Sequence, residues 1–100
     1  VEGMLLGLAI GDALGAPTEG MLPVERRRTY GEIRDFLPPR NNELGTIGAA
    51  TDDTQLAFWT LEQLIEDGGF VPDRLARKLC SDHISGIGNT VRTFIGRYKD

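Results

Sequence analysis

Apolar residues at helical spacing are the feature that most limits what this chain of 100 residues can fold into. The clearest case lies in residues 52–67, where a broad apolar stripe is formed by Leu56, Ala57, Trp59, Leu61, Leu64 and Ile65. Gly68 and Gly69 follow directly and predict the end of this helix. No segment alternates apolar and polar residues as a strand would. The sequence therefore predicts an all-α helical bundle with long loops.

A glycine stripe marks the first predicted helix, residues 3–16. Its members recur every four residues: Gly3, Gly7, Gly11 and Gly15. Each costs about 0.5–1 kcal/mol relative to alanine inside a helix, so the stripe indicates that another backbone approaches closely. The apolar residues between the glycines lead us to expect a buried helix. Asp12 would then be its one ionisable group, either in or beside a binding site or in a structural hydrogen bond or cap.

Pro17 predicts that the first helix ends at Ala16, because proline disfavours α conformation in the residue before it. Glu19 follows in a predicted turn, a carboxylate just beyond a helix end.

Residues 21–30 suggest a short helix that carries Arg26–Arg28. This arginine run either binds phosphate or, as is usual for charge runs, forms a solvated face. We expect residues 31–50 to form a long loop with an extended piece at 33–37.

Thr51, Asp52 and Asp53 precede the apolar stripe and have two compatible interpretations. Thr51 is a good N-cap residue, and aspartates in a first turn complement the helix dipole. Neighbouring side chains on a helix are also about 100° apart, so the two carboxylates can serve two positions of one site, with the Thr51 hydroxyl as a third oxygen. Such hard oxygen donors suit Mg²⁺, Mn²⁺ or Ca²⁺.

A third helix is predicted from Arg74 to about Ser81, followed by the lone His83, to which we assign a structural role. Residues 86–90, Gly-Ile-Gly-Asn-Thr, then precede an amphipathic run. A glycine-containing turn capped by Asn89 or Thr90 is the simplest interpretation. The helix start would also offer free N–H groups to an anion.

Composition excludes several classes of function. The net charge of −4 argues against nucleic-acid binding, and the apolar runs are too short for a membrane span. The single cysteine, Cys80, gives no sign of an oxidising compartment, and the first residues lack the basic region of a signal peptide. We therefore expect a cytoplasmic protein. Both ends look cut, which suggests one piece of a longer chain.

Three motifs together resemble the ADP-ribosylglycohydrolase family. They are Gly7-x-x-x-Gly11-Asp12-Ala13-Leu14-Gly15-x-Pro17-x-Glu19, then Thr51-Asp52-Asp53-Thr54-Gln55, then Gly86-Ile87-Gly88-Asn89-Thr90. The first two are quite specific in this order, and the third is looser. The resemblance covers essentially the whole chain and implies an all-α domain whose cleft holds two divalent ions, Mg²⁺ or Mn²⁺. It further implies hydrolysis of the bond between the ribose anomeric carbon and an acceptor atom.

The resemblance also implies roles for individual residues. Thr51, Asp52 and Asp53 would be metal ligands, and Glu19 the catalytic carboxylate. Asp12 and the four residues Gly86, Ile87, Gly88 and Asn89 would lie toward the substrate. The substrate would be an ADP-ribosylated protein or a small molecule that contains ADP-ribose.

One departure from the family pattern is large. The family completes its metal site with a second acidic motif near its C-terminus, and residues 55–100 contain none. The chain therefore resembles the N-terminal portion of one domain: a truncation, a piece of a split enzyme, or a degenerate remnant. We expect it to need the remainder of the parent chain or a partner subunit. The alternative function is a non-catalytic ADP-ribose or nucleotide binder.

Overall fold

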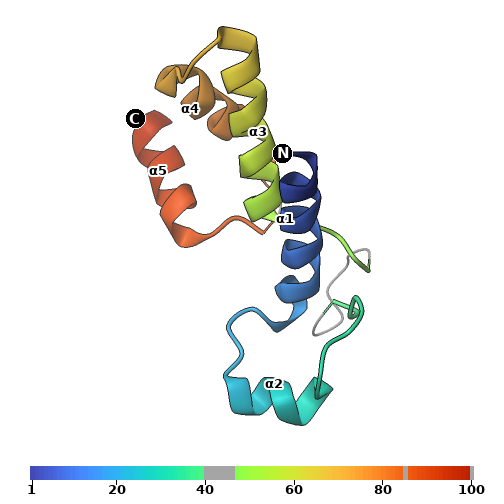
Figure 1. Cartoon of the computed structure of the whole chain (residues 1–100). Coiled ribbons are helices and arrows are strands. Elements are labelled where there is room, and N and C mark those ends of the chain that lie inside the picture. The colour runs from blue at the N-terminus through green and yellow to red at the C-terminus, as the bar shows by residue number, and fades with distance from the viewer. Residues whose placement is uncertain (40–46, 85, 100) are drawn as a thin grey trace. The chain divides into compact units, whose positions relative to one another are not determined.

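The computed structural model describes residues 1–39, 47–84 and 86–99. The described residues form five α-helices and one short 3-10 helix, with no strand among them, which confirms the all-α prediction (Figure 1). None of these helices is long and apolar enough to cross a membrane. The chain divides into two compact units, residues 1–50 and 51–100, and each is described by itself.

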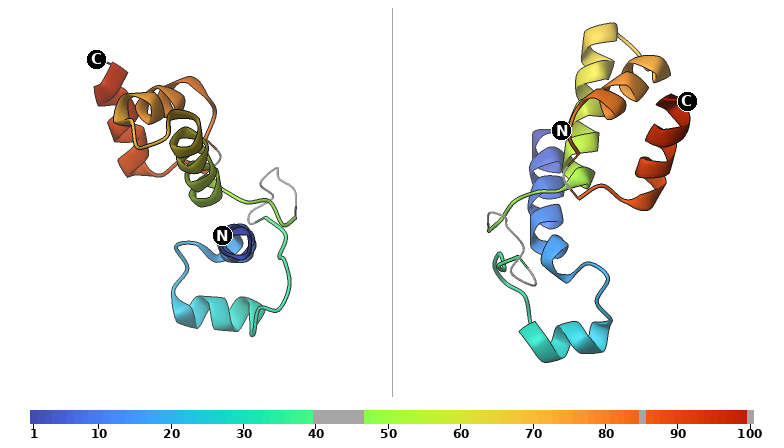
Figure 2. Two further views of the ribbon diagram at one scale, coloured as in Figure 1. Left: turned by 45° about the horizontal axis from the view of Figure 1, so that its top comes forward. Right: turned by 180° about the vertical axis from the view of Figure 1, so that it is seen from behind.

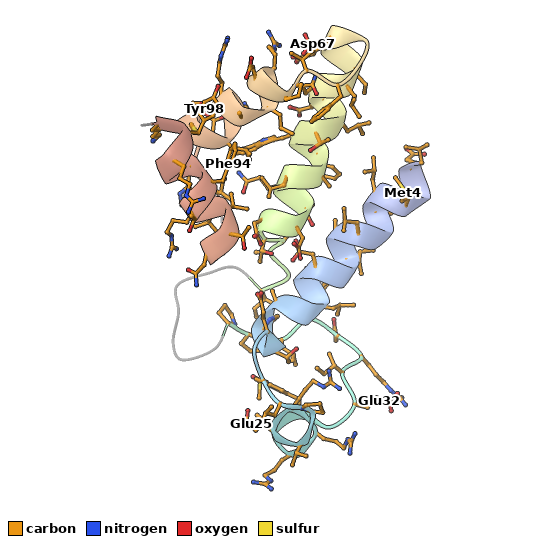
Figure 3. All side chains as sticks on the ribbon, turned by 90° about the vertical axis from the view of Figure 1, so that its left-hand side faces the viewer. Met4, Glu25, Glu32, Asp67, Phe94 and Tyr98 are labelled. Atoms are coloured by element: carbon orange, nitrogen blue, oxygen red, sulfur yellow. The ribbon has the colours of Figure 1, made fainter. Side chains whose placement is uncertain are left out.

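The first unit begins with α1 (Glu2–Gly15) and η1 (Ala16–Thr18). Helix α1 ends one residue before the position predicted from Pro17, which lies in η1. The expectation that α1 is buried is wrong for this chain. Only Ala13 is buried, and an added Cβ at any of the four stripe glycines would meet nothing within 4 Å. Met4, labelled in Figure 3, is 67% exposed.

The short helix α2 (Pro23–Tyr30) completes the helical part of the first unit. The Glu25 carboxylate accepts a hydrogen bond from the Leu22 N–H at 3.3 Å, which satisfies one backbone donor at the helix start. Gly31 ends the helix with a φ of 66°, a conformation that favours glycine. The predicted extended piece at 33–37 forms no strand. Part of the predicted loop, residues 40–46, lies outside the described residues.

The second unit contains α3 (Asp52–Asp67), α4 (Pro72–Ser81) and α5 (Asn89–Lys99). Helix α4 packs against both α3 and α5 (Figures 1 and 2). Gly68 ends α3 in the left-handed conformation, as predicted, and Pro72 begins α4 two residues earlier than predicted. Trp59 is half-buried beneath the Lys78 ammonium, which lies 5.4 Å from the ring centroid, so this tryptophan serves packing.

Candidate functional site

Thr51 lies at the N-cap position of α3, but its hydroxyl does not cap the helix. The residue is extended, with φ −118° and ψ −155°, and its side chain makes no capping hydrogen bond. Its Oγ1 instead donates to Oδ1 of Asp52 at 3.2 Å. The capping interpretation is therefore wrong for the Thr51 hydroxyl. The favourable interaction with the helix dipole still applies to Asp52 and Asp53, whose carboxylates lie in the positively polarised first turn.

The two carboxylates differ in exposure. Asp52 is half-buried like Thr51, whereas Asp53 is exposed and the following Thr54 is 5% exposed. This difference follows from the helix period, because consecutive side chains are about 100° apart. Asp52 therefore shares its surroundings with Thr51, while the carboxylate of Asp53 lies in another direction.

The oxygens at this helix start fit a hard divalent cation. An octahedral Mg²⁺ with bonds of about 2.1 Å places neighbouring ligand oxygens about 3 Å apart. The Oγ1 of Thr51 and Oδ1 of Asp52 are 3.2 Å apart, close to that separation. Among the described residues, no group of three or more His, Cys, Asp and Glu side chains could hold a metal ion. What the helix start offers is thus two carboxylates and a hydroxyl.

After α4 the chain returns to the beginning of α3, which brings the third sequence motif to the second (Figure 1). Gly86 has a φ of +70°, and a Cβ built on it would lie 3.3 Å from the Thr51 Cβ. The same Cβ would lie 4.0 Å from Oδ1 of Asp52. Two motifs with thirty residues between them therefore meet at one helix start.

The other residues of the third motif lie at the start of α5. Ile87 is half-buried, whereas Gly88 and Asn89 are exposed. Asn89 is the first residue of α5, and the Arg92 N–H donates to the Gly88 carbonyl at 3.0 Å. The expectation that Asn89 or Thr90 caps this helix is therefore wrong. Both residues lie within its first turn, and the backbone of Gly88 precedes it.

Gln55 belongs to the second sequence motif, where no role is predicted for it. Its Nε2 donates to the backbone carbonyl of His83 at 2.6 Å, across 28 residues of sequence. The acceptor is the backbone of His83, so the structural role assigned to its imidazole stays a prediction. No local pattern signals such a contact, because the acceptor is a backbone atom of a distant segment.

In the first unit, α1 and η1 position the other two candidate residues. Asp12 is half-buried, and its backbone carbonyl accepts the Ala16 N–H at the end of α1. Glu19 is exposed just after η1, and its backbone N–H donates to the Ala16 carbonyl at 3.2 Å. Glu19 therefore lies on a turn, as predicted. The side chains of Arg26–Arg28 are exposed on α2.

These features define an all-helical protein with a Thr-Asp-Asp sequence at a helix start and a glycine turn against it. The model of the ADP-ribosylglycohydrolase family matches residues 1–100, and the chain belongs to this family. The family assignment made from the three motifs is thereby confirmed.

Two relatives lack an assigned function. An uncharacterised protein of Archaeoglobus fulgidus is 44% identical over 75 residues, which cover 75% of this chain and 24% of the relative. The uncharacterised protein YegU of Escherichia coli is 35% identical over 85 residues, which cover 79% of this chain and 25% of the relative. The chain thus spans about a quarter of the length of the curated relatives it matches.

Proposed function

We propose that the protein carrying this chain is a metal-dependent hydrolase that removes ADP-ribose from a modified protein side chain or small molecule. The observation that carries the proposal is the family match over residues 1–100, with Glu19 and Thr51-Asp52-Asp53 all present. The family is one of glycohydrolases, so a hydrolase is the class of enzyme that the match supports.

Thr51, Asp52 and Asp53 would hold a divalent cation, Mg²⁺ or Mn²⁺. The 3.2 Å between Oγ1 of Thr51 and Oδ1 of Asp52 supports this assignment. Such a cation, when bound, orients ribose hydroxyls and lowers the pKa of water. Asp52 and Asp53 contribute negative charge that balances the cation, and for that reason we assign them no proton transfer.

Glu19 would supply the catalytic carboxylate. It would act as a general base, or it would stabilise positive charge as the bond at the ribose anomeric carbon breaks. Its place on a turn directly after η1 supports this role, because catalytic groups are often presented by loops on a rigid helical frame. Asp12 and the residues Gly86–Asn89 would contribute to substrate binding.

Release of ADP-ribose tests the function directly. The full-length protein would be incubated with acceptors modified on arginine, on serine and as an acetyl ester, with Mg²⁺ or with EDTA. We expect release from at least one acceptor with Mg²⁺ and loss of that activity with EDTA, while residues 1–100 alone release none. Tight binding of ADP-ribose without release from any acceptor would instead favour the alternative, a non-catalytic ADP-ribose binder.

A further inference from the structure

The backbone at Gly86 approaches the start of α3 so closely that a side chain there would press against Thr51. Its φ of +70° is a conformation that residues with a Cβ rarely adopt. A Cβ at this position would also lie only 3.3 Å from the Thr51 Cβ and 3.7 Å from Thr51 Cγ2. The positive φ alone favours glycine, and the 3.3 Å contact would in addition require Thr51 to shift. The backbone of Gly86 thus lies directly against Thr51, whose hydroxyl belongs to the candidate site.

A second contact holds the same part of the chain to α3. The Gln55 amide donates to the His83 carbonyl at 2.6 Å, one turn along the helix from Thr51. Ile84 is 5% exposed and Thr54 is 5% exposed, so both flank this contact as buried side chains. The segment after α4 is thus joined to the first turn of α3 by a hydrogen bond and by the close approach of Gly86.

We infer that Gly86 is a positioning residue for the candidate cation site, and that the hydrogen bond from Gln55 to His83 holds it in place. The inference rests on the proposed function, because it concerns the same oxygens. This positioning role of Gly86 is separate from the contact with substrate that the family resemblance implies. The backbone of Gly86 limits where the Thr51 side chain lies, and thereby where Oγ1 lies relative to Oδ1 of Asp52.

A methyl group at position 86 would displace the site oxygens. The Thr51 Cβ has to move by a few tenths of an ångström to relieve the 3.3 Å contact, and Oγ1 moves with it. Small divalent ions demand near-ideal ligand geometry, so such a shift weakens binding. Loss of a group that orients metal ligands typically costs 10–100-fold in metal affinity.

The experiment compares Gly86→Ala with Gly68→Ala in the full-length protein. Gly68 has nearly the same φ, +69°, and lies at the opposite end of α3, where an added Cβ meets nothing within 4 Å. Both variants therefore place a Cβ at a similar positive φ, and we expect both to lower the midpoint of metal-free thermal unfolding, whereas only Gly86→Ala adds the contact with Thr51. In calorimetric titration with Mn²⁺, we expect Gly86→Ala to raise Kd about tenfold and Gly68→Ala to leave it unchanged.

A second pair of variants covers the case in which Gly86→Ala fails to fold. Gln55→Met removes the donor to His83 at similar side-chain size, and Gln63→Met makes the same change near the other end of α3. We expect weaker Mn²⁺ binding only in Gln55→Met. If Gly86→Ala folds and binds Mn²⁺ with unchanged affinity, the inference is overturned and the proposed function stands. If Gly86→Ala does not fold, unchanged Mn²⁺ affinity in Gln55→Met overturns the inference in the same way. Failure of the wild-type protein to bind Mn²⁺ overturns the proposed function and this inference with it.

Discussion

The hydroxyl of Thr51 is directed toward the neighbouring carboxylate rather than toward the helix backbone. A threonine before a helix usually caps it, and capping was one of the two interpretations that the sequence allowed. In the structure this hydroxyl donates to Oδ1 of Asp52 at 3.2 Å and makes no capping bond, so of the two roles only that of an oxygen ligand stays a prediction. Local sequence was sufficient to single out these oxygens as candidate ligands because the residues are adjacent in the chain.

The residues that contact this helix start were harder to predict. Gly86 was singled out for its glycine-rich motif and assigned to substrate, whereas the structure places its backbone against Thr51. Gln55 received no role, although it contacts His83. Both contacts depend on how the segment after α4 returns to α3, which helix periodicity does not specify.

Glu19 is the residue whose proposed role makes the sharpest kinetic prediction. In the full-length enzyme, we expect Glu19→Gln to lower kcat at least 100-fold with little change in KM, because a general base contributes mainly in the transition state. Glu2→Gln, an exposed carboxylate in the first turn of α1, is the control and should keep wild-type kinetics. A raised KM with intact kcat would assign Glu19 to substrate binding instead.

At the scale of the elements, helix boundaries followed from signals inside each helix. Pro17, Gly68 and Pro72 act through their own backbone conformations, so the ends of α1 and α3 and the start of α4 fall within two residues of their predicted positions. The start of α5 also falls within two residues of its prediction, but the capping residue was misassigned, because the Gly88 carbonyl accepts the first helical hydrogen bond. The burial of α1 was predicted wrongly, since burial depends on what packs against a helix.

Gln63 joins the end of α3 to the turn before α4. Its side chain is 6% exposed, and its Nε2 donates to Oδ2 of Asp67, labelled in Figure 3, at 3.0 Å and to the Gly69 carbonyl at 2.8 Å. Its Oε1 is buried without a hydrogen-bond partner among the described residues. The two hydrogen bonds donated by the Gln63 amide thus stabilise this connection, whereas its buried, unpaired oxygen destabilises it.

We expect Gln63→Met to lower the free energy of unfolding by about 1 kcal/mol. Two hydrogen bonds worth about 0.5–1.5 kcal/mol each are lost, while the burial of an unpaired oxygen is relieved. Denaturant unfolding of the full-length protein measures the change, with Glu62→Met, at an exposed neighbouring position, as the control. Equal stability of Gln63→Met and wild type would show that these hydrogen bonds contribute nothing net.

At the scale of the whole molecule, few apolar side chains are buried. Among the described residues, only Ala13, Ala76 and Ile84 form the buried apolar core, while Leu6 is 63% exposed and Ile65 is 72% exposed. So small a core gives little margin against the entropy of folding. The chain also spans only a quarter of its curated relatives. We therefore expect further polypeptide of the family domain, or a partner subunit, to cover the glycine stripe of α1.

Calorimetric titration of the full-length protein with Mn²⁺ tests most directly the claim that the start of α3 holds a divalent cation. We predict that Asp52→Ala and Asp53→Ala each lower the affinity for Mn²⁺ at least tenfold or abolish binding at one site. Asp73→Ala, which removes a first-turn carboxylate from α4, should bind Mn²⁺ like wild type. If the carboxylates only complement the helix dipole, these variants lose about 0.3–1 kcal/mol of stability and nothing more. Unchanged stoichiometry and affinity in both Asp52→Ala and Asp53→Ala would contradict the account.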